Sequence, residues 1–422
     1  MLALKYIREN VSLVSKSAEM KKTKIDLDEI LSLDSQRRGI LQEVEELKAS
    51  RNKASSLIAE KKRQGEDAAD VILEMRQVSE SIKKLDETLK SIEDKLENLL
   101  YYIPNVIHDS VPAGDNEEDN VFLRDWGSKP VKDFALKDHM ELGESLELFD
   151  LKRATKISGS GFPLYTGNGA RLERSLINFM LDFHTEEHGY KELFPPFLTS
   201  REATTTTGQL PKFEEDMYKI PTDDLYCIST AEIPVTNVHR NEILNEDDLP
   251  INYAAYSACF RREAGSYGKD TRGLLRVHQF NKVEMVKFVT QDSSYDELEI
   301  LTGHAEAVLQ KLGLHYRIVT LCGGDLSFSA AKCYDIEVWA PGMEKYLEVS
   351  SCSNFQDFQA RRGNIRYRSK ADNSLQFVHT LNGSGVATPR LMIALLETYQ
   401  NADGSISIPP VLQKYMGAES IG

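Results

Sequence analysis

Apolar residues in the stretch from residue 71 to 103 recur at alternating spacings of three and four positions. This spacing continues over more than four heptads and predicts one long helix with a narrow apolar seam, which is typical of a coiled coil. Pro104 follows the seam and predicts the end of the helix, because proline lacks a backbone N–H. The seam residues are Met75, Val78, Ile82, Leu85, Leu89, Ile92, Leu96, Leu99 and Ile103.

A second, weaker seam precedes the first, and three charged residues interrupt it: Arg37, Arg51 and Lys61. Between the two patterns, residues 64–67 offer a glycine for a tight turn and an acidic N-cap, so we expect the helices to fold back as an antiparallel hairpin. Helices of about 35 residues would reach roughly 50 Å. The apolar residues of the weaker seam are Ile30, Leu33, Ile40, Val44, Leu47, Ala54 and Ile58.

Beyond residue 130 the apolar runs become short and alternating, and they are mixed with helical patterns such as Leu172 to His188. This mixture predicts an α+β fold, in which a mainly antiparallel sheet is flanked by helices. We therefore expect a helical arm over residues 1–107 and a larger body over 108–422. Residues 108–130 would be a linker, with the exposed acidic segment Asp115 to Asp119.

Composition narrows the function classes. A chain of 422 residues predicts two or three domains, and a net charge of −15 argues against a wholly basic nucleic-acid binder. Charged residues interrupt the first twenty-two positions, so neither a signal peptide nor a membrane span is expected there, and no later segment is apolar enough to be one. The cysteines lack any CxxC spacing and are expected to be reduced and mostly buried: Cys227, Cys259, Cys322, Cys333 and Cys352.

The arm carries a local basic segment in this acidic chain. Between residues 48 and 63, six basic side chains face one acid, Glu60. Such a run is either a solvated helix face or a surface that contacts phosphate groups of a nucleic acid, and the arm by itself leaves both interpretations open. The basic residues are Lys48, Arg51, Lys53, Lys61, Lys62 and Arg63.

The segment from Ala254 to Lys287 predicts a β-hairpin with a glycine-rich polar loop. Strand alternation would place Arg261 and Glu263 on one face. A guanidinium group, a carboxylate and an aromatic ring in one pocket suit the phosphates, amino group and base of ATP, and the chain has no P-loop motif for that task. On the returning strand, one face would carry His278, Phe280, Lys282 and Glu284.

Two further segments carry candidate chemistry. The strand-like run from Tyr346 to Ser351 presents an acid and two hydroxyls, which are oxygen ligands suited to Mg²⁺. The run from Leu381 to Leu391 predicts a loop that leads into a helix. Arg390 would stand in the first turn of this helix, an arrangement that favours anion binding.

Together these segments resemble the class II aminoacyl-tRNA synthetases. FRRE at 260–263 with its returning strand resembles motif two, and GSGVATPR at 383–390 resembles motif three. Gly189 to Phe197 is similar to motif one, which implies a homodimer interface. Within this class the chain resembles the bacterial-type seryl-tRNA synthetase family essentially from end to end. The TAE run at 230–232, the loop GSYGKDTRGLLRVHQF, the EVSS run at 348–351 and the helical arm all occur in the expected order.

The resemblance implies an ATP site with specific roles. Arg261 would hold the α-phosphate, Glu263 would contact the adenine amino group, and Phe280 would stack on the base. Arg272 and Arg390 would bind the outer phosphates, so that Arg261 and Arg390 are the expected catalytic residues. The expected ATP-binding set is Arg261, Arg262, Glu263, Arg272, Val277, Phe280, Glu348, Val349, Ser350, Ser351 and Arg390.

The resemblance also implies a metal site and a serine site. Glu348 and Ser351 would hold Mg²⁺. On an ideal strand they point to opposite faces, so a bend or bulge near Ser350 is expected. A site built around a hydroxyl group would reject alanine, because its polar groups would be left unpaired. The expected serine-binding residues are Thr230, Ala231, Glu232, Arg261, Glu284, Asn382 and Ser384.

The implied reaction has two steps: L-serine and ATP give seryl-adenylate and pyrophosphate, and the seryl group then passes to the 3′ end of serine tRNA, or of selenocysteine tRNA where present. The basic segment of the arm would grip the long variable arm of the tRNA across the dimer. A cytoplasmic location is implied. Pro389 departs from the glycine of many bacterial members and is expected to stiffen the entry to the helix.

Three alternatives compete with this interpretation. His184 and His188 fit the HxxEH pattern of inverted zinc proteases, although we expect capping or surface histidines near a helix end. A synthetase paralogue that loads a carrier protein would look truncated in the arm, which is complete here. A non-catalytic coiled-coil protein would not need an intact Arg261, Glu263, Arg272, Glu348 and Arg390.

Overall fold

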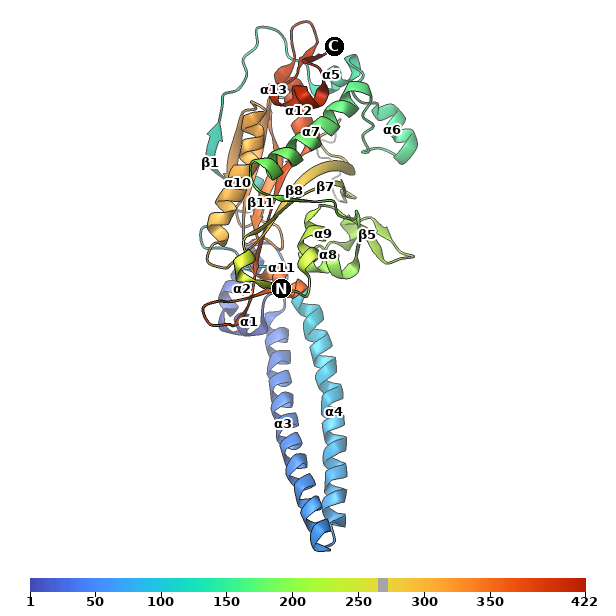
Figure 1. The fold of residues 1–422 in the computed structure, drawn as a ribbon, viewed down its shortest axis with the longest axis vertical. Helices are drawn as coiled ribbons and strands as arrows, with labels where there is room; N and C mark the ends of the chain where they lie inside the picture. The colour runs from blue at the N-terminus through green and yellow to red at the C-terminus, as the bar shows by residue number, and fades with distance from the viewer. Residues whose placement is uncertain (265–271) are drawn as a thin grey trace. The chain divides into compact units, whose positions relative to one another are not determined.

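The computed structural model describes residues 1–264 and 272–422. The chain folds into two compact units (Figure 1). The first comprises residues 2–19 and 23–104, and the second comprises residue 1, residues 20–22 and residues 105–422.

The first unit is dominated by two long antiparallel helices, α3 (Leu27–Gln64) and α4 (Ala69–Leu100), which follow the short helices α1 (Leu4–Glu9) and α2 (Val11–Met20) (Figure 1). Asp26 caps α3 by accepting the Glu29 N–H at 2.9 Å. Gly65 ends α3 with φ of 74°, a left-handed conformation that glycine adopts without steric cost. The expected turn is therefore confirmed. The expected acidic N-cap is wrong, because the N-cap of α4 is Ala68; Asp67 precedes it and accepts the Ala69 N–H at 2.9 Å.

The seams of α3 and α4 pack against each other, which confirms the predicted hairpin. The charged interruptions Arg37, Arg51 and Lys61 stay in the same frame and are half-buried. Arg37 Nε lies 2.9 Å from a carboxylate oxygen of Glu93 on α4, so its charged head has a partner on the opposite helix. The seam therefore tolerates a charged residue when the aliphatic part of its side chain packs between the helices and its charged group reaches a partner. Its buried side chains within the two helices include Ile30, Leu33, Val44, Ile82, Ile92 and Leu96.

The second unit is built on an eight-stranded sheet with the order β1-β9-β10-β11-β14-β8-β7-β2. Among the described residues of this sheet, β2 and β7 form the one parallel pair, so the mainly antiparallel sheet is confirmed. The strands are β1 (Val121–Trp126), β2 (Lys191–Leu193), β7 (Ile251–Phe260), β8 (Gln279–Val289), β9 (Tyr316–Thr320), β10 (Lys332–Ala340), β11 (Lys345–Asn354) and β14 (His379–Ala387).

Three helices pack against this sheet and bury the principal hydrophobic core: α7 (Gly167–Glu186), α10 (Ser294–Lys311) and α12 (Thr388–Tyr399) (Figure 1). Small sheets form from β3 (Leu198–Ser200), β4 (Lys219–Ile220) and β5 (Leu225–Cys227), from β6 (Ile243–Asn245), β12 (Arg366–Arg368) and β13 (Leu375–Phe377), and from β15 (Ile406–Ser407) and β16 (Ser420–Ile421). The other α-helices are α5 (His139–Ser145), α6 (Leu151–Ser158), α8 (Arg201–Thr207), α9 (Glu232–Thr236), α11 (Phe358–Gly363) and α13 (Pro410–Met416).

Two local expectations are corrected. The stretch 108–130, expected as a linker, contributes the edge strand β1, which pairs with β9. The Leu381–Leu391 run is not a loop, because residues up to Ala387 form β14 between β11 and β8. Its glycines allow close packing: a Cβ on Gly383 would meet the Cys352 sulfur at 3.0 Å, and one on Gly385 would meet His184 at 2.4 Å. Only the tertiary structure reveals this use of glycine.

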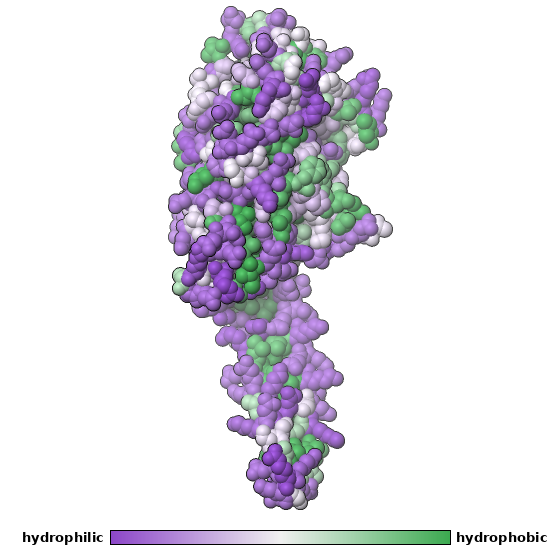
Figure 2. Space-filling view, in the orientation of Figure 1, coloured by the Kyte–Doolittle hydropathy of each residue, from purple (hydrophilic) through white to green (hydrophobic). Residues whose placement is uncertain are grey.

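The surface and the cysteines have the properties that the composition predicted. Purple, hydrophilic residues predominate on the face shown in Figure 2. Among the described residues, no helix has the length and apolar character needed to cross a membrane. All five cysteines are free thiols; Cys227 is half-buried and the other four are buried, as expected.

The seam of the arm makes a stability prediction. Leu96 is 2% exposed, and Leu96→Ala should destabilise the hairpin by about 2–4 kcal/mol, because it removes buried methyl groups and leaves a cavity. Amide hydrogen exchange of the full-length protein should show faster exchange along α4. Leu73→Ala is the matched control on the same helix, since Leu73 is 59% exposed, and we expect a change within about 0.5 kcal/mol. Equal rates of amide hydrogen exchange along α4 in the two variants would contradict the predicted burial of Leu96 in the seam.

Candidate active site

The β7–β8 hairpin supplies the centre of the candidate site. Its strands pair from Ile251↔Phe288 to Phe260↔Gln279, which confirms the predicted hairpin, and residues 265–271 of its loop lie outside the described residues. The expected shared face of Arg261 and Glu263 is wrong, because β7 ends at Phe260 and Glu263 has φ of 51°.

On β8 the alternation holds, apart from His278, which precedes the strand. Phe280, Lys282 and Glu284 follow one another at every second position, and the Arg261 guanidinium lies over the Phe280 ring, 5.1 Å from its centroid. One face of β8 thus carries an aromatic ring, an ammonium group and a carboxylate.

A buried polar cluster continues from this face. The ammonium group of Lys282 is ion-paired with Glu284, and both side chains are under 8% exposed. The Thr230 hydroxyl donates to Glu284 Oε2 at 3.2 Å, and Ser384 on β14 is the register partner of Glu284. The other oxygen, Glu284 Oε1, is buried and has no hydrogen-bond partner among the described residues. A buried carboxylate oxygen without a donor is costly, so it suits a ligand that brings N–H groups.

Glu232 lies at the start of α9 in the same cluster. Its carboxylate accepts from Gln359 Nε2 at 2.6 Å, and the Gln359 oxygen accepts from the Thr380 hydroxyl at 2.7 Å. Burial, and secondly the nearby Glu284 carboxylate, raise the pKa of Glu232 to about 7. Glu232 therefore changes its charge near neutral pH.

Three further arginines each meet a carboxylate. Glu263 accepts from Arg276 Nε at 2.5 Å, so the side chain expected at the adenine amino group is ion-paired here. Arg272 Nη1 lies 2.9 Å from Asp138 Oδ2, and Arg390 Nη1 lies 3.2 Å from Glu348 Oε2.

Arg390 also organises the backbone around it. It stands in the first turn of α12, as expected, and donates to the carbonyl oxygens of Leu275 at 3.1 Å and Glu348 at 3.0 Å. The guanidinium group thereby connects Leu275, in the segment that leads into β8, with Glu348 in β11.

The bulge expected near Ser350 is present in β11. Ile336 pairs with Ser350 but Glu337 pairs with Glu348, so Val349 is the extra residue. Two successive side chains, Val349 and Ser350, are therefore buried, whereas Glu348 is exposed and Ser351 half-exposed. The bulge lets Glu348 and Ser351 face the same way.

The remaining predicted residues lie at the edges of these clusters. Ala231 and Val277 are buried, and Asn382 on β14 pairs with Ser353 and Val286. Arg262 instead lines a shallow surface pocket together with residues of the 214–219 segment. The Ser350 hydroxyl donates to the Ser384 carbonyl at 2.5 Å and so ties β11 to β14.

The basic segment of the arm lies along the second half of α3 and its last turn. Arg51 and Lys61 are half-buried in the seam. Lys48 approaches Asp86 of α4 at 3.8 Å. The exposed members are Lys48, Lys53, Lys62 and Arg63.

Several residues of the site have a role that the sequence did not predict. Lys282 was placed on the correct face but not paired with Glu284, and Gln359 comes from α11, far along the chain. Asp335 is the register partner of Ser351, and burial, with Glu348 nearby, raises its pKa well above the usual range. Pairing the strand before the EVSS run with it as an antiparallel hairpin would have placed Asp335 opposite Ser351.

The HxxEH histidines serve packing. His184 is buried, not a capping or surface residue as expected, and its ring contacts the Gly385 carbonyl at 2.9 Å and His188 at 3.0 Å. His188 stacks on His304 at 4.0 Å between ring centroids. Among the described residues, no group of three or more His, Cys, Asp or Glu side chains is placed to hold a metal ion.

An antiparallel sheet with this hairpin, and with an arginine at the start of the helix that follows β14, is the core of a class II aminoacyl-tRNA synthetase. The family model described as tRNA synthetase class II core domain (G, H, P, S and T) matches residues 213–399. The model described as seryl-tRNA synthetase N-terminal domain matches residues 1–107. The chain belongs to the seryl-tRNA synthetase family.

Relatives match over the whole chain. A serine–tRNA ligase of Chloroherpeton thalassium is 56% identical, with all of both chains covered, and one of Syntrophobacter fumaroxidans is 55% identical, with 99% of each covered. Among solved structures, seryl-tRNA synthetase from Pyrococcus horikoshii complexed with ATP has a TM-score of 0.93 and 39% identity, covering 100% of this chain and 99% of that one. The cytoplasmic enzyme from Naegleria fowleri in complex with AMP has a TM-score of 0.89 and 28% identity, covering 100% and 98%.

The buried ion pair leads to a prediction about stability. Glu284→Gln should destabilise the second unit by about 3–5 kcal/mol, because the buried Lys282 ammonium group would lose the carboxylate with which it is ion-paired. Urea unfolding followed by tryptophan fluorescence reports this unit, since Trp126 and Trp339 both lie in it.

The control is Asp247→Asn. It breaks a pair with Lys370 whose side chains are 70% and 59% exposed, and such a pair contributes about 1 kcal/mol or less. Equal midpoints for the two variants would contradict the predicted role of the buried pair.

Proposed function

We propose that this chain is a serine–tRNA ligase that converts L-serine and ATP to seryl-adenylate and pyrophosphate and then transfers the seryl group to the 3′ end of serine tRNA. The observation that carries the proposal is the buried carboxylate pair of Glu232 and Glu284, next to hydroxyl groups and near Arg261. The names of the full-length relatives support it.

Charge and hydrogen bonding indicate which residues would bind serine. Glu284 Oε1 and Glu232 would receive the ammonium group, since both carboxylates are buried. Thr230, Asn382 and Ser384 would lie near the serine hydroxyl. Alanine lacks that hydroxyl and would leave their polar groups unpaired, which supports rejection of alanine.

The positions of the arginines indicate which residues would bind ATP. Arg261 would hold the α-phosphate, and Phe280, already covered by the Arg261 guanidinium, would offer its ring to adenine. Arg272 and Arg390 would neutralise the outer phosphates and the departing pyrophosphate. Positioning of the serine carboxylate against the α-phosphorus, with this charge stabilisation, supplies catalysis without a protein nucleophile.

Mg²⁺ is the expected metal, and the residues present fit it. Glu348 and Ser351 face the same way across the bulge, and Asp335 lies opposite Ser351. The raised pKa of Asp335, caused by burial and secondly by Glu348, fits two carboxylates that gain from a cation between them. A bound Mg²⁺ would supply positive charge to the phosphates, held by Glu348 and Ser351.

The arm and the sheet edge suggest the macromolecular partners. We propose that residues 1–107 form a tRNA-binding domain, whose basic segment contacts the phosphates of serine tRNA, and that residues 108–422 form the catalytic domain. The segment from Gly189 to Phe197 carries the edge strand β2 and the 76% exposed Phe194, features that support a homodimer interface. A role in protein synthesis would place the protein in the cytoplasm. Selenocysteine tRNA is a further candidate substrate.

A charging assay tests the proposed activity. With total tRNA and each of the twenty amino acids in turn, serine alone should give aminoacyl-tRNA at a high rate, and serine should also drive ATP–pyrophosphate exchange. Exchange without tRNA charging would favour loading of a carrier protein. Absence of exchange would favour a decayed enzyme.

Removal of the arm separates the two steps. Deletion of residues 38–94 with a short linker joins points that lie close together, since Arg37 on α3 is ion-paired with Glu93 on α4. We expect this variant to keep serine-dependent exchange and to lose most tRNA charging. Equal loss of both would mean that the arm is a folding element.

Serine binding should depend on pH through Glu232. Because the pKa of Glu232 is raised to about 7, its carboxyl group is mostly neutral at pH 6 and mostly ionised at pH 8, and only the ionised form attracts the ammonium group. The apparent Kd for serine should fall about tenfold from pH 6 to pH 8 by proton linkage. Calorimetry at several pH values measures it. Glu232→Gln should bind more weakly with no such slope, and a wild-type Kd that is flat across this range would contradict the assignment.

A further inference from the structure

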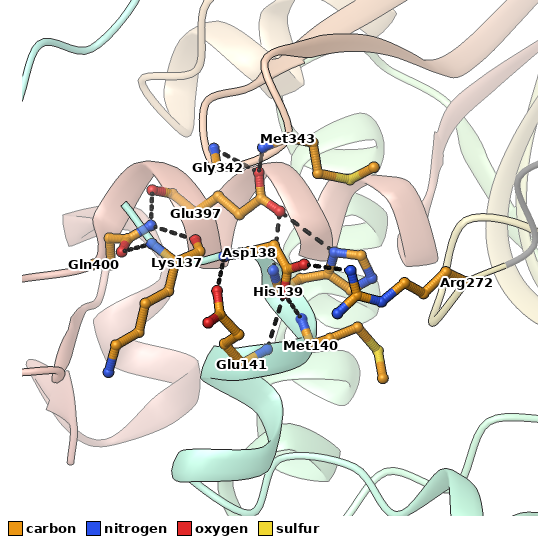
Figure 3. Close-up of polar contacts among 10 residues, drawn as sticks. All are labelled: Lys137, Asp138, His139, Met140, Glu141, Arg272, Gly342, Met343, Glu397 and Gln400. Carbon is orange, nitrogen blue, oxygen red and sulfur yellow. Dashed lines mark hydrogen bonds and ion pairs between the residues drawn. The ribbon is translucent and has the colours of Figure 1, made fainter. Parts of the chain in front are cut away.

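A fully buried carboxylate in the last two turns of α12 binds two other segments of the chain. Glu397 is 0% exposed, and its Oε1 accepts from the His139 backbone N–H at 3.0 Å and from His139 Nδ1 at 3.3 Å (Figure 3). Its Oε2 accepts from the N–H groups of Gly342 at 2.9 Å and Met343 at 3.2 Å. Four donors offset the cost of burying this charge, so the segments are held firmly against α12.

A second contact, made by the residue that follows α12, fixes the same segment. Gln400 accepts from the Lys137 N–H at 2.9 Å and donates to the Lys137 carbonyl at 3.0 Å (Figure 3). Together, Gln400 and Glu397 fix the backbone on both sides of Asp138. Arg390 stands seven residues before Glu397 on α12, so the helix that carries a candidate catalytic arginine also positions Asp138.

Asp138 divides its carboxylate between two tasks. Oδ1 caps α5 by accepting the N–H groups of Met140 at 2.9 Å and Glu141 at 3.0 Å. Oδ2 lies 2.9 Å from Arg272 Nη1 (Figure 3). Arg272 is 64% exposed, and a pair this exposed contributes about 1 kcal/mol or less to stability. The pair therefore matters for the orientation of Arg272 and not for folding.

The residues after Arg272 are docked on the same framework. A Cβ on Gly273 would meet His139 Nε2 at 2.3 Å, so the Gly273 backbone lies directly on the His139 ring. Leu274 is 0% exposed in the core, and the Leu275 carbonyl accepts from Arg390. From Arg272 onward, the return of the hairpin loop is thus fixed at successive residues.

We propose that Asp138, held on α12 by Glu397 and Gln400, is a positioning residue that orients the Arg272 guanidinium toward the outer phosphates of ATP. This inference rests on the proposed function for the role of Arg272. The Asp138 carboxylate stays on Nη1 when ATP binds and limits the rotation of the side chain. Less orientational freedom is lost on binding, so ATP and pyrophosphate bind more tightly.

Asp138→Asn tests this role, because asparagine caps helices as well as aspartate does but presents an uncharged amide to Arg272. We expect the Kd for ATP, measured by calorimetry, and the KM values for ATP and pyrophosphate in exchange to rise about five- to tenfold. The KM for serine should stay within about twofold and the Tm within about 2 °C of the wild type, since cap and core are intact.

Asp150→Asn is the matched control. Asp150 caps α6 through the Arg153 N–H and is ion-paired with the exposed Arg153, so it loses the same kind of charge away from Arg272. ATP binding by this variant should equal that of the wild type. The same weakening in both variants, or tighter ATP binding by Asp138→Asn, would overturn the inference.

A double-mutant cycle identifies the residue through which Asp138 acts. In an Arg272→Gln background, Asp138→Asn should have little further effect on the Kd for ATP, because the group it orients is gone. A full fivefold or larger penalty in that background would overturn the inference. The calorimetric readout needs no turnover. A wild type that binds ATP but shows no serine-dependent exchange would therefore count against the proposed function alone.

Discussion

Charged side chains buried in the middle of the main sheet depend on partners supplied by other strands and helices. Lys282 and Glu284 are buried on β8, and Glu284 also takes the Thr230 hydroxyl from the segment before α9. Removing any one partner would leave a charge in an apolar interior, at a cost of several kcal/mol. The elements that meet here are therefore fixed relative to one another, and the candidate site is the place where they meet.

Other buried acids extend the same constraint through the second unit. Glu173 on α7 accepts from Asn281 on β8 and from Thr388 at the start of α12, and burial raises its pKa to about 7. Glu397 at the other end of α12 holds the start of α5 and the β10–β11 turn. A helix anchored at both ends keeps Arg390 in place, which is the preorganisation that charge stabilisation of a phosphate requires.

Much of the fold could be predicted from local patterns. The 3–4 spacing predicted the arm, because an apolar seam on a helix requires a partner seam, and Gly65 marked the turn. Strand alternation predicted the shared face of Lys282 and Glu284. The bulge near Ser350 was expected only from the family resemblance, which implied that Glu348 and Ser351 hold one metal ion. Alternation failed for Arg261 and Glu263, because β7 ends at Phe260 and the backbone turns at Glu263.

The sequence by itself determined which residues carry charge, that the arm is a helical hairpin, and how the motifs follow one another. Only the tertiary structure decided which buried charges are paired, since Gln359 reaches Glu232 and Asp138 reaches Arg272 across more than a hundred residues of chain. It also decided that the Gly-Ser-Gly run is a central strand, because close packing against Cys352 and His184 outweighs the local preference for a loop. The physical reason is that burial and partner choice are properties of the packed interior, where a charge without a partner costs more than any local propensity.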